Sequence, residues 1–377
     1  MNLPPQLSRR SFGKMMGVTA AYVALQPASS RFVSRAARTA SMSDGAVVRL
    51  SANENPYGPS QKALKAMNDA FSLAWRYPDE HEDALIDTLR TLNKVSSDQI
   101  LLGNGSGEIL RLAGSSFTDA NRPLVMASPT FEAIGYHAQV AGAKVVRVPL
   151  TSDYAHDLAK MAQTNAGLVY ICNPNNPTAS ITPKDQVRAY LAKVPESTIV
   201  LVDEAYHHYV ESDSYESVIP LIEQHPNLMV ARTFSKIYGM AGLRCGYCVA
   251  QASLLRTMRP RRTMDSVNIM ALVAANASLP DATHVDEGRK RNSAVKKFVC
   301  GELDKSGFTY IPSHANFMMI DLRREVRPVI SGLRQRGVEV GRVFPALPNF
   351  LRVTIGTQPE METFIKEFRT VMNSGSA

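Results

Sequence analysis

The stretch VLVDEAY, residues 200–206, is an apolar run of strand length that ends in the acid Asp203. A run without polar alternation is typical of a strand buried on both faces, as in a parallel sheet covered by helices. Asp203 would then lie at the carboxyl edge of the sheet, where open α/β sheets bind their ligands. Taken alone, such an aspartate is more often a helix cap or an ion-pair partner, so the neighbouring stretches decide its meaning.

Runs of the same kind recur along the chain, separated by segments of helix length. The strand-like runs are 100–102, 124–127, 144–149, 167–172, 198–203, 228–232 and 246–250, and the helix-length segments include 107–117, 130–141 and 183–193. This alternation predicts an α/β fold whose large domain has a mostly parallel, seven-stranded sheet. Beyond residue 260, a long helical region precedes strand-like runs at 308–311, 316–321, 338–340 and 351–355, which predicts a smaller α+β domain.

The predicted organisation has four parts: a leader at 1–40, an N-terminal arm at 41–75, a large domain at 76–260 and a small domain at 261–377. In the leader, Arg9 and Arg10 precede an apolar run of about 11 residues, which is the pattern of a twin-arginine export signal. Such a run has the length of a signal peptide and is too short to span a membrane. We therefore expect export to the periplasm without membrane association afterwards. An ordinary basic N-terminus would instead leave the protein in the cytoplasm.

The basic charge of the chain is concentrated in that leader. The whole sequence has 42 Lys and Arg against 34 Asp and Glu, a net charge of +8. Six of the basic residues and none of the acids fall in residues 1–40, so 36 basic and 34 acidic residues remain, a net charge of +2. A folded region so close to neutral lacks the strong positive field of nucleic-acid-binding proteins, and we expect no nucleic-acid partner.

Two patterns raise the question of a metal site. Cys245 and Cys248 form a C-x-x-C, a spacing that suits a metal or redox pair, and His207 and His208 follow Tyr206 directly. In a strand, positions 245 and 248 point to opposite faces, so two buried packing cysteines are expected. The two histidines have no third ligand at a suitable spacing. The sequence therefore predicts no bound metal.

Polar motifs follow three other expected strands, and each motif alone is a weak signal. TFSK at 233–236 contains a lysine, and GNGSGE at 103–108 precedes an expected helix. NPNNPT at 173–178 contains asparagines, and its prolines restrict the backbone and so the direction of the asparagine side chains. The flexible backbone of GNGSGE can direct amide N–H groups at a phosphate. We expect an amine, an acid and an amide from separate strand ends to converge on one ligand.

In this order, the motifs resemble those of the fold-type I pyridoxal-phosphate (PLP) aminotransferases, most closely the histidinol-phosphate aminotransferase branch. Further matches are LSANENPYGPS at 50–60, YPD at 77–79, NF at 316–317 and LRVTIG at 351–356. The resemblance covers about residues 47–370, and its motifs are specific because they occur together and in register. It implies the fold-type I architecture, pyridoxal 5′-phosphate as cofactor, and amino-group transfer between an L-amino acid, or a histidinol-phosphate-like amine, and a 2-oxo acid.

The resemblance implies a role in the chemistry for five residues. Lys236 would form the Schiff base with the cofactor and then move the substrate proton as base and acid. Asp203 would pair with the pyridine nitrogen and keep it protonated. Tyr206 and Asn176 would hydrogen-bond the phenolic oxygen of the ring, and Phe131 would stack on its face. Lys236, Asp203 and Tyr206 are thus the expected catalytic residues.

Other residues would hold the cofactor phosphate and the substrate. The phosphate ligands that the resemblance implies are the amides of Ser106 and Gly107, the Ser235 hydroxyl and the Arg244 guanidinium. Tyr57 would reach the phosphate bound by a second subunit, so the resemblance also implies a homodimer with shared sites. Arg352 would bind the substrate α-carboxylate through two hydrogen bonds, and Asn53 would support that end of the substrate.

The sequence departs from the family pattern at three positions. Ala179 replaces the glycine that usually ends N-N-P-T-G, and we expect a small backbone adjustment there. Gly107 replaces an acid before Glu108, which removes one hydrogen bond near the phosphate. Gly341 stands where the histidinol-phosphate enzymes have a substrate-binding arginine, and Arg342 follows one residue later. A shift of one residue along a strand reverses the face, so Arg342 is expected not to replace it, which argues against a phosphorylated substrate.

Two other classes of function fit parts of this pattern. A PLP-dependent lyase, decarboxylase or cyclase uses the same scaffold, and a non-catalytic PLP-binding protein, such as a regulator, would share the fold. A regulator of this kind usually has an added DNA-binding module, which residues 1–40 do not resemble, and the lysine is intact. Conversion of the cofactor to its pyridoxamine form by an amino acid, reversed by a 2-oxo acid, identifies an aminotransferase.

Overall fold

The computed structural model of the protein describes residues 47–374. The predicted leader with its twin-arginine motif, residues 1–40, lies outside the described residues, as does the start of the predicted arm. Within the described part of the chain, no helix has both the length and the apolar character that crossing a bilayer requires.

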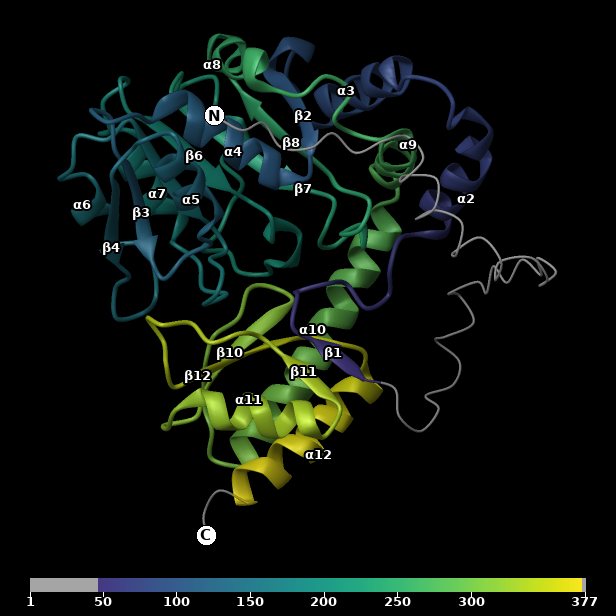
Figure 1. The fold of residues 1–377 in the computed structure, drawn as a ribbon, viewed down its shortest axis with the longest axis vertical. Coiled ribbons are helices and arrows are strands. Elements are labelled where there is room, and N and C mark those ends of the chain that lie inside the picture. Colours follow the sequence, from purple (N-terminus) through teal and green to yellow (C-terminus); the bar gives the residue numbers. More distant parts are fainter. Residues whose placement is uncertain (1–46, 375–377) are drawn as a thin grey trace, which may run out of the picture. The chain divides into compact units, whose positions relative to one another are not determined.

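A seven-stranded sheet forms the centre of the larger part of the structure (Figure 1). Its strands are β2 (Ile100–Asn104), β3 (Leu124–Ser128), β4 (Val145–Pro149), β5 (Leu168–Cys172), β6 (Ile199–Asp203), β7 (Leu228–Thr233) and β8 (Cys245–Ala250). They pair in the order β2-β8-β7-β6-β5-β3-β4, and β8 runs antiparallel to both of its neighbours while the other pairs are parallel. The predicted mostly parallel, seven-stranded sheet is confirmed. The polar motifs that follow β2, β5, β6 and β7 therefore meet at one edge.

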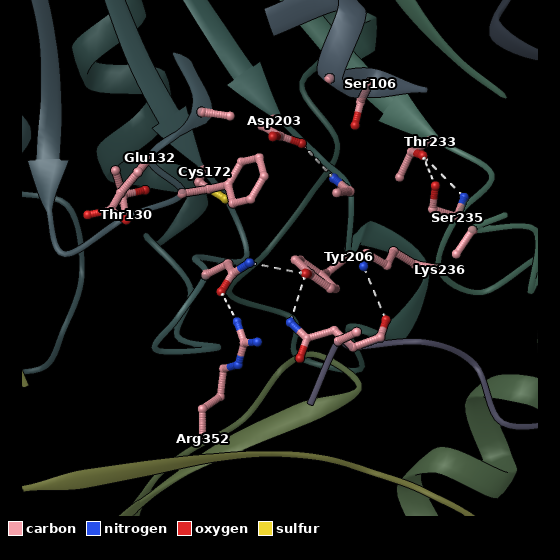
Figure 2. Close-up of a pocket in the computed structure, with 18 of the residues that line it drawn as sticks. Ser106, Thr130, Glu132, Cys172, Asp203, Tyr206, Thr233, Ser235, Lys236 and Arg352 are labelled. Atoms are coloured by element: carbon pink, nitrogen blue, oxygen red, sulfur yellow. Dashed lines mark hydrogen bonds between the residues drawn. The ribbon is translucent and has the colours of Figure 1, made fainter. Parts of the chain in front are cut away.

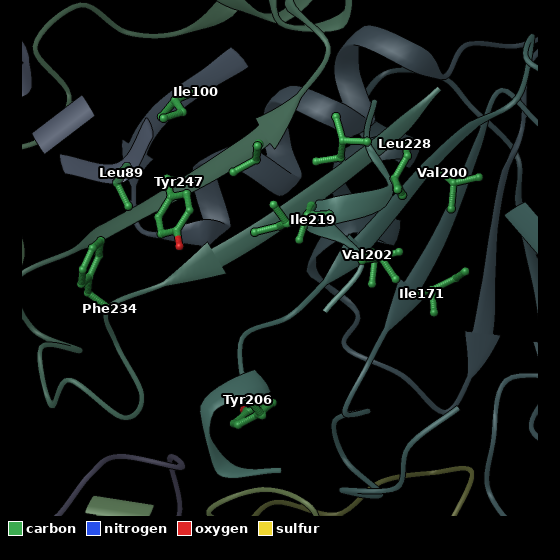
Figure 3. Packing of buried hydrophobic residues seen from close by; sticks show 14 of the residues in the cluster. Leu89, Ile100, Ile171, Val200, Val202, Tyr206, Ile219, Leu228, Phe234 and Tyr247 are labelled. Carbon is green, nitrogen blue, oxygen red and sulfur yellow. The ribbon is translucent and has the colours of Figure 1, made fainter. Parts of the chain in front are cut away.

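Side chains along these strands alternate between two apolar clusters, one on each face of the sheet. Val200 and Val202 of β6 pack in the first cluster, and Leu201 between them packs in the second. Figure 3 shows part of the first cluster, to which Ile171 of β5 and Leu228 of β7 also belong. Because both faces are buried, the strands are apolar at nearly every position.

The two cysteines of the C-x-x-C pattern follow the same alternation. Cys245 is buried in the first cluster and Cys248 in the second, so their side chains occupy opposite faces of β8. Both thiols are free, and burial raises the pKa of each to about 12. The prediction of two packing cysteines is confirmed.

Helices cover both faces of this sheet. The first cluster includes residues of α3 (Asp79–Asn93), α6 (Leu158–Met161), α7 (Lys184–Leu191) and α9 (Ile269–Ser278), and the second includes residues of α4 (Ser106–Phe117), α5 (Ala133–Val140) and α8 (Ala252–Met258). The helix α2 (Gln61–Ala70) packs against α9, and the Ser60 hydroxyl caps its start by accepting the Ala63 N–H at 3.1 Å. Short 3-10 turns are η2 (Phe71–Leu73), η3 (Ser97–Gln99), η4 (His207–Tyr209), η5 (Ile219–Leu221) and η6 (Arg259–Arg261).

The smaller part of the structure is α+β, as predicted. Its strands β9 (Thr309–Ile311), β10 (Phe317–Asp321) and β12 (Phe350–Thr354) form an antiparallel sheet, and β1 (Val48–Leu50) pairs in parallel with β11 (Val338–Val340). Its helices are α10 (Ala282–Lys305), α11 (Val326–Gln335) and α12 (Gln358–Ser374), which share one apolar cluster. Figure 1 shows α10 running from beside α9 to α11 and α12. The described residues, 47–374, belong to one compact unit, so the predicted boundaries near residues 75 and 260 stay predictions.

Candidate active site

A cavity of about 480 Å³ opens at the carboxyl edge of the seven-stranded sheet (Figure 2). Eleven of the twelve residues predicted for the site line it: Asn53, Ser106, Gly107, Phe131, Asn176, Asp203, Tyr206, Ser235, Lys236, Arg244 and Arg352. A volume of this size is typical of small-molecule and cofactor sites. The twelfth predicted residue, Tyr57, does not line this cavity and is described below.

Lys236 lies three residues beyond the end of β7, in a bend of the chain. Its amine, Nζ, donates a hydrogen bond to the backbone oxygen of Asn53, at 3.1 Å. Burial, helped by repulsion from the Arg352 guanidinium, lowers the pKa of this amine to about 8. A lysine with this pKa is partly unprotonated near neutral pH, so its lone pair is free to attack a carbonyl carbon.

Asp203 is the last residue of β6, and its carboxylate is buried at the floor of the cavity. The Ala205 N–H donates to one carboxylate oxygen at 3.1 Å, and the Tyr170 hydroxyl donates to the other at 2.8 Å. Burial raises the pKa of Asp203 to about 6, although both hydrogen bonds and the charge of Lys236 act in the opposite direction. Tyr170 is not among the predicted site residues; the sequence feature that marks it is a hydroxyl within the otherwise apolar strand LVYIC, residues 168–172.

Tyr206 presents its hydroxyl to the cavity within a network of amides (Figure 2). Its oxygen accepts hydrogen bonds from the side-chain amides of Asn53, at 3.0 Å, and Asn176, at 3.4 Å. A phenol that accepts two hydrogen bonds keeps its own proton available to donate. Burial raises the pKa of Tyr206, so this proton is retained at physiological pH. The arrangement suits donation to an anionic oxygen on a bound ring.

The start of α4 and the loop before β8 form a cradle for an anion. The first N–H groups of α4, at Ser106 and Gly107, have no acceptor within the helix and point out of its end. Arg244 lies against this turn: a Cβ at Gly105, whose φ is 71°, would be 2.3 Å from its Nη2. Arg244 Nη1 also donates to the Ser235 hydroxyl, at 3.4 Å. Backbone amides, a hydroxyl and a guanidinium together fit a phosphate group.

Arg352, on β12 of the smaller part, reaches the opposite side of the cavity. Its Nη1 donates to Asn176 Oδ1 at 2.8 Å, and its Nη2 donates to the Ser51 backbone oxygen at 2.7 Å. Its Nε is buried and has no hydrogen-bond partner among the described residues. The guanidinium also lies 5.1 Å from the ring centre of Phe344. This held and partly unpaired cation can bind a carboxylate.

Arg342 lies beyond the end of its strand, so the strand-face reasoning does not apply to it, and whether it replaces the substrate-binding arginine stays a prediction. The strand β11 ends at Val340, so the alternation of faces does not continue to Arg342, which lines the cavity beside Arg352. Arg342 pairs with Glu132 at 2.5 Å and lies 4.4 Å from the ring centre of Phe344. A Cβ at Gly341 would lie 2.8 Å from the Arg352 backbone oxygen, so glycine permits the close approach of these two segments. The Arg342 guanidinium is therefore present at the cavity, although Gly341 replaces the arginine of the histidinol-phosphate enzymes.

The structure also shows the exposure or backbone conformation of three other positions that the sequence singled out. Phe131 precedes α5, which begins at Ala133 rather than at residue 130 as expected, and its ring is 39% exposed at the cavity wall. Tyr57 is also 39% exposed and lies away from the cavity, where the guanidinium of Arg291 is 5.1 Å from its ring centre. Ala179 has a φ of 59°, the left-handed region that favours glycine.

The histidines after Tyr206 lie in a buried polar cluster behind the cavity. His207 Nδ1 is 3.3 Å from the Tyr215 hydroxyl, and His208 Nε2 is 3.3 Å from the Tyr238 hydroxyl. Burial lowers the pKa of both imidazoles, so they are neutral at physiological pH. Among residues 47–374, no three His, Cys, Asp or Glu side chains are grouped in a way that could hold a metal ion.

Comparison with known proteins gives one consistent family. Residues 45–368 match the family model described as Aminotransferase class I and II. The chain is 39% identical over 332 residues to the histidinol-phosphate aminotransferase of Moorella thermoacetica, a match that covers 86% of each chain. It is 37% identical over 324 residues to the histidinol-phosphate aminotransferase of Bacillus velezensis, covering 85% of this chain and 90% of the relative.

A solved structure agrees with these relatives. The histidinol-phosphate aminotransferase from Sinorhizobium meliloti, crystallised with PLP, has a TM-score of 0.82 and 28% sequence identity, covering 88% of this chain and 92% of the other. The cavity fits the same cofactor, because it offers an amine, a buried carboxylate and an anion cradle at the ends of neighbouring strands. The chain therefore belongs to the aminotransferase class I and II family, and it is a PLP-dependent aminotransferase.

Proposed function

We propose that this aminotransferase exchanges an amino group between an L-amino acid, or a histidinol-phosphate-like amine, and a 2-oxo acid, with Lys236 as its catalytic amine. The observation behind this proposal is the convergence of Lys236, Asp203, Arg244 and Arg352 on one cavity, from three separate segments. When bound, PLP supplies an aldehyde that condenses with amines and a protonated ring that accepts electron density.

Lys236 performs the covalent step and the proton transfer. With a pKa of about 8, its amine is sufficiently deprotonated to attack the aldehyde and sufficiently basic to remove a proton from a substrate carbon. The backbone oxygen of Asn53 accepts a hydrogen bond from Nζ and directs the amine into the cavity. With PLP bound and the substrate amine attached to it, the free amine of Lys236 would move the proton between the substrate carbon and the cofactor carbon.

Other side chains would hold the ring and its phosphate. Asp203 would face the ring nitrogen as a carboxylate, which favours the protonated nitrogen. The Tyr206 hydroxyl, oriented by the amides of Asn53 and Asn176, would donate to the ring oxygen. The cradle formed by the start of α4, Ser235 and Arg244 would bind the phosphate at the other end of the ring.

Arg352 and Arg342 would bind the acidic end of the substrate. Arg352 is held by two acceptors and lines the cavity, so the remaining N–H groups of its guanidinium can meet a carboxylate. The relatives at 39% and 37% identity are named for histidinol phosphate, a phosphorylated amine without an α-carboxylate. Arg342 also lines the cavity, where it pairs with Glu132, and a phosphate or carboxylate that displaced Glu132 would meet a second guanidinium. We therefore include histidinol phosphate among the candidate donors.

A panel of amino donors tests the proposed reaction. Purified protein saturated with PLP is mixed with histidinol phosphate or one of several aromatic and aliphatic L-amino acids, and the cofactor absorbance is followed. We expect at least one donor to convert the cofactor to its pyridoxamine form and 2-oxoglutarate to reverse the change. Release of carbon dioxide or loss of a substrate side chain without this reversible change would instead identify a decarboxylase or lyase. No change with any donor would favour a non-catalytic PLP-binding protein.

We propose that the active unit is a homodimer in which Tyr57 reaches the phosphate in the partner's site. Tyr57 is exposed and does not line the cavity of its own chain, as is expected of a residue that serves a second subunit. The segment between α2 and α3 also exposes Phe71, Trp75 and Tyr77, which are 65%, 73% and 81% exposed. Exposed aromatic residues gathered in one segment are typical of a surface that a partner covers. Refolding Lys236→Ala and Tyr57→Phe subunits together and measuring the activity of the mixture tests this proposal.

We also propose that residues 1–40 direct export by the twin-arginine route, on the basis of Arg9, Arg10 and the apolar run that follows. A reporter protein fused behind residues 1–46 should appear in the periplasm. Replacing both arginines, Arg9→Lys and Arg10→Lys, should retain most of it in the cytoplasm. The matched control changes Arg31→Lys and Arg35→Lys and should leave export intact. Export that survives the first pair of changes, or is absent from the unaltered fusion, would contradict the proposal.

A further inference from the structure

Tyr170 places a hydroxyl inside an apolar layer, directed at one acid. It lies in the middle of β5, is 0% exposed, and packs among residues of the second apolar cluster, on the same face of the sheet as Leu201 of β6. Its hydroxyl donates to Asp203 Oδ2 at 2.8 Å. Because β5 and β6 are parallel, with Cys172 opposite Asp203, the ring of Tyr170 runs forward along the sheet to reach the carboxylate.

This hydrogen bond discriminates between the two protonation states of Asp203. The phenol is fully buried and its pKa is raised well above its usual value, so it retains its proton and donates it. An ionised carboxylate accepts such a hydrogen bond strongly, whereas a protonated one gains less from it. With the Ala205 N–H on Oδ1, each oxygen of Asp203 has one donor, which fixes the orientation of the carboxylate.

The surroundings of Asp203 otherwise oppose its negative charge. Burial in this apolar layer disfavours the ionised form, and the carboxylate of the adjacent residue Glu204 acts in the same direction. Lys236 favours the ionised form, but its own amine is buried and partly neutral. The thiol of Cys172 faces the same space and stays protonated, since burial raises its pKa. Tyr170 is therefore the principal hydrogen-bonding side chain that supports the ionised Asp203.

We propose that Tyr170 is a positioning residue that holds the Asp203 carboxylate in the ionised form and orientation required by the protonated ring nitrogen of PLP. It acts through Asp203 and does not line the cavity itself. The inference rests on the proposed pairing of Asp203 with that nitrogen. In the sequence, such a residue is a tyrosine on the neighbouring parallel strand, two residues before the position that pairs with the catalytic acid. Here Cys172 pairs with Asp203, and Tyr170 lies two residues before Cys172.

The test measures the equilibrium affinity of the cofactor-free protein for two ligands. One is PLP, and the other is its 1-deaza analogue, in which a C–H group replaces the ring nitrogen. Tyr170→Phe should weaken PLP about 10- to 100-fold, the range for loss of a hydrogen bond to a charged group, and should change the affinity for the analogue by less than about threefold. A purely structural role would instead weaken both ligands equally.

Tyr190→Phe is the matched control. Tyr190 is a tyrosine of α7, 6% exposed, that lies outside the cavity, and its variant should bind both ligands like the wild type. Circular dichroism melts of the cofactor-free proteins establish that each variant is folded. Should Tyr170→Phe not fold, Tyr170→Leu removes the same hydroxyl and gives the same comparison.

The outcomes separate this inference from the function on which it rests. Equal affinity of the wild type for PLP and the analogue would show that Asp203 does not contact the ring nitrogen, and the proposed role of Asp203 would fail. A wild-type preference for PLP that survives unchanged in Tyr170→Phe overturns the role of Tyr170 alone. Equal weakening of both ligands also overturns it.

Discussion

Lys236→Ala should abolish turnover, with a fall of at least about 10⁴-fold, because one side chain supplies both the nucleophile and the general base. The variant should also lack the absorbance of a covalently attached cofactor, while the anion cradle of α4, Ser235 and Arg244 still binds PLP reversibly. Single-turnover kinetics and absorbance spectra measure the two effects. A variant with normal turnover would refute the assignment of Lys236.

The wild-type protein adds a pH dependence to this prediction. Since burial lowers the pKa of Lys236 to about 8, the amine is largely protonated below pH 8 and largely free above it. The rate at which cofactor-free protein captures PLP covalently should therefore rise about tenfold per pH unit below pH 8 and level off above it. A rate that kept rising toward pH 10 would show a lysine with an ordinary pKa.

Lys296→Ala is the matched control for this experiment. Lys296 is also largely enclosed, donates to the Ser313 backbone oxygen at 2.6 Å, and has a pKa that burial lowers. It lies outside the cavity, so its loss should leave turnover and the cofactor spectrum unchanged. If Lys296→Ala lost both turnover and the cofactor absorbance, the result would indicate that removing any enclosed lysine disrupts the protein.

Lys236→Ala also tests whether the active site is shared between two subunits. In a dimer whose sites combine Lys236 of one subunit with Tyr57 of the other, a mixed dimer of Lys236→Ala and Tyr57→Phe subunits has one intact site and one doubly altered site. Activity after refolding the two variants together should therefore exceed that of the separate proteins. If Tyr57 served its own chain, the mixture would show only the sum of the two activities.

Asp203→Asn should lower turnover by about 10²- to 10⁴-fold, the effect of removing one partner of a buried ion pair. An uncharged amide cannot keep the ring nitrogen protonated, so the bound ring would withdraw electrons less effectively. Transient kinetics of the half-reaction with a competent amino donor measure this loss. Unchanged proton removal from the substrate would contradict the role given to Asp203.

The same substitution should stabilise the cofactor-free protein. Burial raises the pKa of Asp203 to about 6, above its ordinary 3.8, so the folded chain holds the proton more tightly than the unfolded chain. Above pH 6 the ionised form is disfavoured in the fold, and removing the charge should raise stability by about 1 to 3 kcal/mol. Well below pH 3.8 the carboxyl is protonated in both states, and this gain should disappear.

Denaturant titrations of wild type and variant at pH 8 and at about pH 3 measure the gain in stability. Asp281→Asn is the matched control, since Asp281 is 9% exposed but pairs with Lys62 at 3.1 Å and lies outside the cavity. Its loss should not stabilise the protein at either pH. A variant of Asp203 that is less stable at pH 8 than the wild type would show that its carboxylate contributes to folding rather than to function alone.

Much of the fold follows from local sequence. Each apolar run such as 199–203 became a strand because burial on both faces of a parallel sheet requires apolar side chains at successive positions. Polar residues at or just beyond the ends of those runs, such as Asp203 and Lys236, then had to lie at the edge where parallel strands end. The same alternation placed Cys245 and Cys248 on opposite faces without knowledge of any neighbour.

Tertiary structure alone decided the contacts between distant segments. Arg342 lines the cavity because β11 ends at Val340, and the end of a strand depends on its pairing with β1 rather than on local pattern. The reach of the Tyr170 hydroxyl to Asp203 depends on the register of β5 against β6, which only long-range packing sets. Periodicity along a chain specifies which face a side chain occupies, whereas the partner it meets there depends on how separate elements are brought together.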